Sequence, residues 1–387
     1  MSATTAKVWD VIIVGAGPAG VSTALHLAQI APHLLSQTLI LEKERHPRPK
    51  LCGGGILPDG EVILRRLGLD LTEIPHVDVE WAHFDFGCPG LTMRAKDSMP
   101  YAFRVIQRDE FDAWLAEKAR QRGCIIHENT SVQDLKVGEE YVEVETNRGL
   151  YRARVVVGAD GSNSRVRHAI APHSGPLPAR LLEVYTSVKP ESTSHRLSDS
   201  YFDFICISEG VSGYVWDFPA LVKGQPMRNR GIYDWNHIRR AGRKPLKQIL
   251  SEELRRHGQN LDEYPLAGHP IRWFDAHGTF SAPRVILAGD AAGVDALYGE
   301  GISLALGYGK IAAEALRDAF EQGEFNFDGY RQRVLREPLG IALRRRTFFS
   351  HIIYRITSPA IQRLIWCRLR RIVKWLVQTF LIGWSEW

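Results

Sequence analysis

The residues best placed to do chemistry are glycines and carboxylates that follow short apolar runs. The first group is Gly15-Ala16-Gly17-Pro18-Ala19-Gly20. In this motif Gly15 permits a tight turn, Gly17 lets the backbone approach a pyrophosphate, and Gly20 lets a helix pack on a strand. Glu42 follows about 20 residues later, where a carboxylate can accept hydrogen bonds from ribose hydroxyls. The motif predicts a dinucleotide site and leaves NAD and FAD as alternatives. Its expected contacts are Gly15, Gly17, Ala19, Gly20 and Glu42.

Two later segments repeat the pattern of an apolar run, glycine and aspartate. Val155-Val156-Val157-Gly158-Ala159-Asp160-Gly161 leads into a basic helix start, and Val285-Ile286-Leu287-Ala288-Gly289-Asp290 precedes Gly299-Glu300-Gly301-Ile302. The Asp290 carboxylate suits the polyol chain of a flavin. A helix that begins near Gly301 can stabilise negative charge on a reduced isoalloxazine ring. The additional cofactor contacts expected here are Asp160, Gly289, Asp290, Gly301 and Ile302, although the segment with Asp160, taken alone, could be a plain turn.

The elements that must position these residues can be predicted from hydrophobic spacing. Val8–Val14 and Thr38–Leu41 are typical of buried strands, and Val21–Ile30 between them has helical spacing. From Leu181 to Trp273 the pattern changes to short alternating runs, which predict an antiparallel sheet with one face free to roof a pocket. The expected fold is α/β, with a Rossmann-like dinucleotide-binding domain, an inserted antiparallel β-sheet and a C-terminal helical segment.

In this order the glycine-acid segments resemble the FAD-binding frame of the aromatic-hydroxylase-like flavoproteins, which include hydroxylases, halogenases and geranylgeranyl reductases. The resemblance covers most of residues 8 to 330 and implies that the dinucleotide is FAD. It also implies that Arg108, in Arg-Asp-Glu-Phe-Asp-Ala-Trp-Leu, lies near the FAD phosphates or ribose. The alternative for Arg108 is a surface arginine at a helix start. No second dinucleotide fingerprint marks an NADPH domain, so NADPH and a reduced carrier protein are both retained as electron donors.

An aromatic motif and a glycine-rich segment indicate one branch of this frame. The residues Tyr-Val-Trp-Asp-Phe-Pro at 214–219 place three aromatic side chains on one face of a strand, as sheet core or as the wall of an apolar pocket. Together with Lys-Leu-Cys-Gly-Gly-Gly-Ile at 50–56, they resemble the geranylgeranyl reductase family. The resemblance implies that the aromatic residues line a prenyl-substrate cavity and that the Cys-Gly-Gly segment passes beside the flavin. A small buried hydrophobe is the alternative role for Cys52. The predicted catalytic or substrate residues are Cys52, Gly53, Gly54, Tyr214, Trp216 and Phe218.

These segments define the expected domain boundaries. The FAD-binding domain would be discontinuous, over residues 1–75, 101–180 and 275–340. The substrate-binding domain would take residues 76–100 and 181–274. Residues 341–387 would form a basic, aromatic helical tail.

The charge of the chain is concentrated in this tail. Residues 344–387 contain nine Arg or Lys and one Glu, in a chain whose net charge is +5. A helix there can lie on a membrane surface, with its cations toward anionic headgroups and its tryptophans at the apolar boundary. The alternative is a helical hairpin that closes the substrate pocket. The two roles are compatible, because a lid that rests on the membrane would perform both. Because the basic cluster is confined to an apolar tail, nucleic-acid binding is not expected. The tryptophans concerned are Trp366, Trp375, Trp384 and Trp387.

Cysteine usage and the absence of long apolar runs predict the compartment. The five cysteines are odd in number and scattered, which argues against a disulfide framework or a metal site. No secretion signal is recognisable, and no run of 18 apolar residues occurs. We therefore expect a cytoplasmic protein, on the inner face of the membrane if the tail binds lipid.

The function that the resemblance to the geranylgeranyl reductase family implies is FAD-dependent reduction of carbon–carbon double bonds in an isoprenoid chain or a prenylated lipid. No side chain stands out as the proton donor, and Asp295 and Tyr298 are the candidates nearest the predicted flavin loop. Two alternatives remain. One is an FAD-dependent monooxygenase of an apolar substrate, and the other is a membrane-associated flavin electron-transfer protein.

Overall fold

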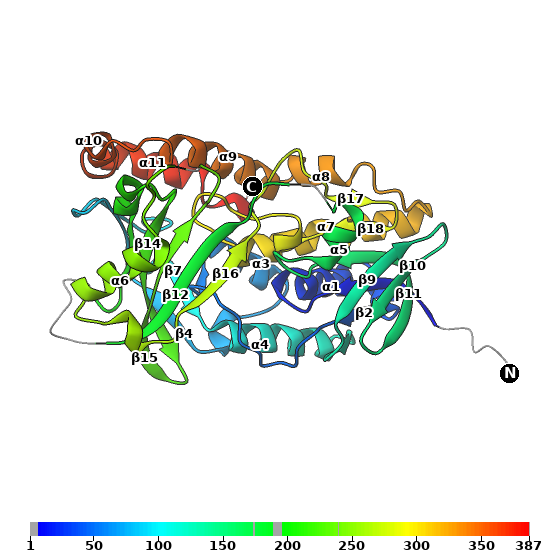
Figure 1. Cartoon of the computed structure of the whole chain (residues 1–387). Helices are drawn as coiled ribbons and strands as arrows, with labels where there is room; N and C mark the ends of the chain where they lie inside the picture. Colours follow the sequence, from blue (N-terminus) through cyan, green and yellow to red (C-terminus); the bar gives the residue numbers. More distant parts are fainter. Residues whose placement is uncertain (1–6, 173–174, 189–195, 239, 387) are drawn as a thin grey trace.

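A computed structural model describes residues 7–172, 175–188, 196–238 and 240–386 of the chain. Figure 1 shows a mainly parallel sheet at one end of the molecule, a mainly antiparallel sheet at the other, and the C-terminal helices along one side of both. The α/β fold predicted from the sequence is thus confirmed.

The first sheet has eight strands, in the order β17-β18-β11-β1-β2-β8, with β10 and β9 added to β11. Strands β18, β11, β1, β2 and β8 run parallel. The runs predicted as strands, Val8–Val14 and Thr38–Leu41, are β1 and β2. The other strands are β8 (Ile125–His127), β9 (Val132–Val137), β10 (Val142–Thr146), β11 (Gly149–Gly158), β17 (Ser281–Ala282) and β18 (Val285–Leu287).

Helices cover the centre of this sheet because strands such as β2 and β18 are buried on both faces. Helix α1 begins at Pro18, directly after the glycine turn, and packs along α7. The N-terminus of α7 follows Gly301, where the sequence predicted a helix to begin. The helices and short turns of this part are α1 (Pro18–Ile30), α2 (Pro32–Leu35), α3 (Pro58–Arg66), η1 (Leu71–Glu73), α4 (Arg108–Gln121), α5 (Arg165–Ile170), η4 (Gly289–Ala291) and α7 (Ile302–Gln322).

The second sheet has seven strands, in the order β16-β12-β15-β14-β13-β5-β6. Neighbouring strands are antiparallel, as predicted, except that β13 and β5 are parallel. Parallel neighbours require a long connection, and here four strands of the first sheet, β8 to β11, lie between β5 and β13 in the chain. The strands are β5 (Ala82–Asp85), β6 (Leu91–Met93), β12 (Ala179–Ser187), β13 (Ser200–Asp203), β14 (Gly213–Val222), β15 (Gln225–Asp234) and β16 (Ala267–Ile271).

A small third sheet joins the two larger parts. It contains β3, β7 and β4, paired antiparallel in that order. Its strands are β3 (Gly55–Ile56), β4 (His76–Val79) and β7 (Phe103–Ile106), and the remaining elements beside the second sheet are η2 (Phe204–Glu209), α6 (Leu246–Arg256) and η3 (Leu261–Glu263).

The C-terminal segment forms a helical hairpin that returns to the start of the fold. The backbone N–H groups of Gly383 and Ser385 donate to the Asp59 carboxylate in the first turn of α3, at 2.9 and 2.7 Å. No helix among the described residues is long and apolar enough to span a membrane. The elements are α8 (Tyr330–Arg336), α9 (Pro338–Ile353), α10 (Pro359–Arg363), the π-helical turn η5 (Leu364–Arg368), α11 (Arg370–Phe380) and η6 (Trp384–Glu386).

The tail tryptophans do not all lie where a membrane helix would place them. Trp366 is 3% exposed and stacks on Phe204, with 4.4 Å between ring centroids, because the hairpin packs onto the second sheet. Trp384 is 4% exposed and fits against Gly307 of α7, where a β-carbon would lie 2.6 Å from the indole. Of the predicted boundary tryptophans that the structure describes, only Trp375 is exposed. Trp387 lies outside the described residues.

Candidate active site

A cavity of about 1160 Å³ lies between the first sheet and the antiparallel sheet. It exceeds the roughly 300–1,000 Å³ of most small-molecule pockets, so it has room for a large cofactor and a substrate together. The carboxyl ends of β1, β2 and β11 form one end, and side chains of β12, β14 and β16 form the other. Every predicted site residue lines this cavity except Gly20 and Gly289.

The first glycine turn has the geometry of a phosphate-binding loop. Gly15 has a φ of +103°, which side chains rarely adopt. A β-carbon on Gly20 would lie 2.0 Å from the Gly15 carbonyl oxygen, so Gly20 serves helix packing and does not face the cavity. A β-carbon on Gly17 would have only Arg48 Nη2 within 4 Å, at 3.8 Å. The N-terminus of α1 is therefore open to an anion from the cavity.

Glu42 and two arginines surround this turn. The two Glu42 carboxylate oxygens accept hydrogen bonds from the backbone N–H groups of Ala16 and Glu44, at 2.8 and 3.0 Å. Arg108 makes a two-pronged contact with Asp112, at 2.9 Å for both bonds, and its side chain is almost buried. The surface alternative for Arg108 is therefore wrong. Arg48 Nη2 lies 3.2 Å from the same Asp112 carboxylate, so the two cations share one anion beside the cavity.

The other two glycine-acid turns differ in what their carboxylates do. Asp160 lines the cavity, yet it accepts hydrogen bonds from Ser164 Oγ and from the Arg165 and Val166 N–H groups, and so caps α5. Asp290 accepts a 2.9 Å hydrogen bond from Ser162 Oγ. A β-carbon on Gly301 would lie 3.6 Å from Asp290 Oδ1, which brings this carboxylate and the start of α7 to one place.

Gly289 contributes through packing. It has a φ of +63°, and a β-carbon there would lie 2.7 Å from the Ala19 β-carbon. The η4 turn therefore sits directly against the first turn of α1. This contact aligns the glycine loop with Asp290.

The aromatic motif forms a wall of the cavity. Tyr214, Trp216 and Phe218 alternate along β14 and all three line it. Gly231 stands opposite Trp216 in the β14–β15 register, where a β-carbon would lie 2.2 Å from the indole ring. The glycine thus leaves the space that the tryptophan fills. Phe202, Phe103 and Phe84 extend the wall, with the Phe202 and Phe218 ring centroids 4.9 Å apart.

The Cys-Gly-Gly segment passes close to this wall. A β-carbon on Gly53 would lie 3.3 Å from the Phe218 ring, and Gly54 has a φ of +77°. The Cys52 N–H donates to Glu183 Oε1 at 3.0 Å, and burial raises the pKa of the Cys52 thiol. Burial also raises the pKa of Glu183 to about 7. Because its pKa is raised, the Cys52 thiol is protonated at neutral pH and does not act as a nucleophile.

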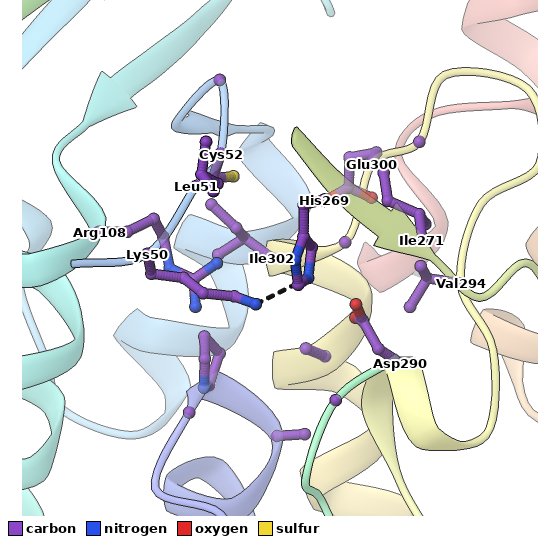
Figure 2. A pocket seen from close by; sticks show the side chains of 18 of the residues that line it. Lys50, Leu51, Cys52, Arg108, His269, Ile271, Asp290, Val294, Glu300 and Ile302 are labelled. Carbon is purple, nitrogen blue, oxygen red and sulfur yellow. Dashed lines mark hydrogen bonds between the residues drawn. The ribbon is translucent and has the colours of Figure 1, made fainter. Parts of the chain in front are cut away.

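Several cavity residues were not singled out from the sequence. Arg48, the pair Lys50 and His269, and Arg346 all line the cavity, and Figure 2 shows Lys50 and His269 hydrogen-bonded there. Arg48 follows the predicted ribose acid by six residues, and a basic residue beside a predicted phosphate site was the available signal. No local signal could have located Arg346, because it comes from the basic tail.

Three tyrosine hydroxyls fix the loop before α7. The carbonyl oxygens of residues 296, 297 and 298 accept hydrogen bonds from Tyr233 of β15, Tyr354 at the end of α9 and Tyr214 of β14, respectively. The Asp295 carboxylate accepts the N–H groups of residues 297 and 298. The antiparallel sheet and the tail thereby hold the loop that leads to Gly301.

Comparisons with known proteins agree with this geometry. A family model described as an FAD binding domain matches residues 8–306. A digeranylgeranylglycerophospholipid reductase of Thermoplasma acidophilum is 27% identical over 346 residues, which cover 83% of this chain and 81% of the relative.

Solved structures show the same fold. A geranylgeranyl bacteriochlorophyll reductase-like protein from Thermoplasma acidophilum superposes with a TM-score of 0.76 at 20% identity, covering 98% of this chain and 95% of that one. The p-nitrophenol 4-monooxygenase of Pseudomonas putida superposes with a TM-score of 0.70 at 18% identity, covering 99% and 97%.

Proposed function

The chain belongs to the FAD binding domain family and is an FAD-dependent oxidoreductase, and we propose that it saturates carbon–carbon double bonds in an isoprenoid chain or a prenylated lipid. The observation that carries the proposal is the pairing of the aromatic wall on β14 with the side-chain-free segment Gly53–Gly55, beside Gly301. The name of the Thermoplasma relative supports the same substrate class.

The residues of the cavity fit FAD. The open N-terminus of α1 suits the pyrophosphate, Glu42 the ribose and Asp290 the ribityl chain, while Arg48 and Arg108 supply positive charge near the phosphates. Gly53 to Gly55 allow a planar ring to lie flat against backbone. When bound and reduced, FAD supplies a hydride equivalent to the substrate.

The chain itself contributes orientation and exclusion of water. The aromatic wall offers a continuous apolar surface for an extended chain, and burial of such a chain contributes roughly 25 cal/mol per Å² of apolar area. Val377 and Ile382 of the tail also line the cavity, so the hairpin shields that side from solvent. A double bond held between the wall and the glycine segment meets the requirement for proximity.

We further propose that the outer face of the tail rests on an anionic membrane surface. Seven of the large exposed hydrophobic residues of the described chain lie between residues 348 and 375. Exposed arginines accompany them at 363, 368, 370 and 371. Each basic residue near such a surface contributes about 1 kcal/mol. Because α11 turns Val377 toward the cavity and Trp375 toward solvent, it separates the cavity from the proposed membrane surface.

The proposal is tested with anaerobic, FAD-loaded protein reduced by dithionite. Addition of a geranylgeranyl lipid should restore oxidised flavin absorbance, and the product should gain two mass units per double bond. Flavin that is reoxidised only by oxygen would favour a monooxygenase, whose fold is represented by the Pseudomonas enzyme. Flavin that responds only to a protein would favour an electron carrier. Stopped-flow reduction with NADPH then decides between NADPH and a reduced carrier protein as the donor.

A further inference from the structure

A buried ion cluster lies where the tail meets the loop before α7. Arg346 of α9 is 1% exposed, and its Nη1 lies 3.3 Å from Asp295 Oδ2 and 3.2 Å from Glu300 Oε2. Its other nitrogens, Nε and Nη2, donate to the Leu381 carbonyl oxygen at 3.0 and 2.7 Å. One guanidinium therefore faces two buried carboxyl groups. With both ionised, the cluster would carry one more negative than positive charge in a largely buried place, which is costly.

The two carboxyl groups are not equally supported as anions. Asp295 accepts hydrogen bonds from the N–H groups of Leu297 and Tyr298, at 2.7 and 3.2 Å, besides its contact with Arg346. Glu300 accepts one backbone hydrogen bond, from Ser303 at 2.8 Å. Hydrogen bonds to a carboxylate favour its charged form. Both carboxyl groups contact Arg346, but Asp295 accepts more backbone hydrogen bonds, so the geometry favours Glu300 over Asp295 as the protonated member of the cluster.

Glu300 is also the member of the cluster with access to the substrate. It lines the cavity directly before Gly301 and Ile302, whereas Asp295 does not line it. In Figure 2, Glu300 lies beside Ile271 on the side of His269 away from Cys52 and Arg108. The carboxyl group thus reaches the part of the cavity where α7 begins.

The structure assigns to Glu300 the role of proton donor in the proposed double-bond reduction, and this role rests on that proposed function. One alkene carbon receives a hydride, which the reduced cofactor supplies with its two electrons. The π electrons of the alkene form the second C–H bond with the proton of the Glu300 carboxyl group. Glu300 is left as a carboxylate paired with Arg346, and after product release a proton from bulk solvent, carried by water that enters the cavity, restores the carboxyl group.

The other charged and titratable groups around Glu300 agree with this role. Burial raises the pKa of both Glu300 and Asp295, and Arg346 opposes the rise in each case. Tyr298 also lines the cavity, but burial raises the pKa of its phenol further, so it holds its proton more tightly than a carboxyl group does. Asp59 of α3 adds negative charge near Arg346, and Asp290 lies close to Gly301.

The test compares Glu300→Gln with the wild type in the anaerobic assay. General acid catalysis contributes about 10² to 10⁴-fold, so alkene-driven flavin reoxidation should slow by at least about 100-fold. FAD binding and dithionite reduction should stay at wild-type values. Glu324→Gln, on the exposed end beyond α7, is the matched control and should reoxidise at the wild-type rate. Tyr298→Phe should retain turnover. If Tyr298 were the proton donor, this variant would lose turnover.

An infrared measurement gives a second readout that needs no substrate. The infrared C=O band of protonated carboxyl groups at neutral pH should lose intensity in Glu300→Gln. The same measurement on Glu183→Gln shows how much of the band comes from Glu183, another buried glutamate. Where Glu300→Gln does not fold, Glu300→Asp keeps the carboxyl group and should reoxidise slowly with a shifted pH profile. A wild type that never reoxidises with alkene would refute the proposed function. The donor assignment would be refuted if alkene reoxidised the wild type and Glu300→Gln equally fast. It would also be refuted if Glu300→Asp reoxidised as fast as the wild type with an unchanged pH profile.

Discussion

The Lys50 Nζ atom lies 2.8 Å from His269 Nε2, and the two residues come from different parts of the fold. Lys50 precedes the Cys-Gly-Gly segment, and His269 lies on β16 of the antiparallel sheet. Burial lowers the pKa of His269 to about 4 and also lowers the pKa of Lys50. A neutral imidazole therefore accepts the lysine hydrogen bond at neutral pH, which joins the two sides of the cavity.

This pair predicts a loss of stability in acid. The pKa of His269 is about 4 in the folded state and 6.5 without burial, so the unfolded state binds more protons between these values. Stability from His269 is thus complete above pH 6.5 and falls as the pH drops toward 4. His269→Gln should reduce the loss of unfolding free energy between pH 7 and 5 by about 1 kcal/mol, after allowance for partial exposure. Urea titrations of the FAD-free proteins at several pH values measure the unfolding free energy. An equal dependence of this free energy on pH in the wild type and His269→Gln would contradict the prediction.

The glycine loop predicts two different outcomes for two similar substitutions. Gly17 has a φ of −81°, which alanine tolerates, and its β-carbon would point into open cavity. Gly17→Ala should therefore leave the FAD-free melting temperature unchanged and weaken FAD binding at least about tenfold, which corresponds to about 1.4 kcal/mol. Gly20→Ala places a β-carbon 2.0 Å from a backbone oxygen and should unfold the protein. Fluorescence titration with FAD and thermal melts decide, and unaltered FAD affinity in Gly17→Ala would place the pyrophosphate elsewhere.

The aromatic wall predicts a substrate defect separate from the cofactor. Phe218→Leu keeps an apolar side chain but removes the ring that faces Gly53. We expect the KM for a geranylgeranyl lipid to rise about tenfold, which corresponds to about 1.4 kcal/mol, while FAD affinity is unchanged. Val215→Ala, on the other face of β14 in a separate core, is the control and should affect only stability. A Phe218→Leu enzyme with wild-type KM would exclude this face from substrate binding.

Two thiols outside the active site predict a redox-sensitive link. Cys88 Sγ and Cys367 Sγ lie 2.8 Å apart, joining the loop between β5 and β6 to η5. A mild thiol oxidant such as a small-molecule disulfide should couple them, so that the number of titratable thiols falls from five to three and the chain loses two hydrogens. Mass spectrometry of peptides identifies the pair. Cys88→Ser should form no intramolecular cross-link, because a mixed disulfide between Cys367 and the small molecule then has no second thiol to displace it.

The outer face of the tail predicts binding to anionic vesicles. Trp375 is 58% exposed on α11, close to the exposed arginines of the hairpin. Trp375→Ser should weaken co-sedimentation with vesicles containing an anionic phospholipid several-fold, and high salt should weaken it further. Leu177→Ser removes a similarly exposed apolar residue elsewhere and should have no effect. Equal sedimentation of both variants would argue against the tail as the membrane contact.

Local patterns predicted the parts of this molecule that local physics controls. The strand–turn–helix around Gly15 follows from an apolar run, a glycine turn and a following helix, and the alternation of β14 placed Tyr214 and Phe218 on one face. The structure has these elements at the predicted residues. Each depends on neighbours in the chain, so its pattern can be recognised in the sequence.

Residues that depend on distant packing could not be predicted in this way. Arg346 resembles its exposed neighbour Arg344 in sequence, but it is buried because Asp295 and Glu300 face it from another element. His269 lies in an unremarkable stretch and meets Lys50, 219 positions away. Trp366 and Trp375 both fitted a membrane helix, and only the contact of η5 with the second sheet separates them.

The two hydrogen bonds between the tail and Asp59 have a consequence for biosynthesis. They join residues that are 324 and 326 positions apart in the chain. The tail also supplies Arg346, Val377 and Ile382 to the cavity. A chain emerging from the ribosome can form the glycine loop early, but one wall of its cavity is missing until the hairpin has been made. Stable capture of the cofactor should therefore be a late, post-translational event, and nascent chains stalled before residue 340 should not retain FAD.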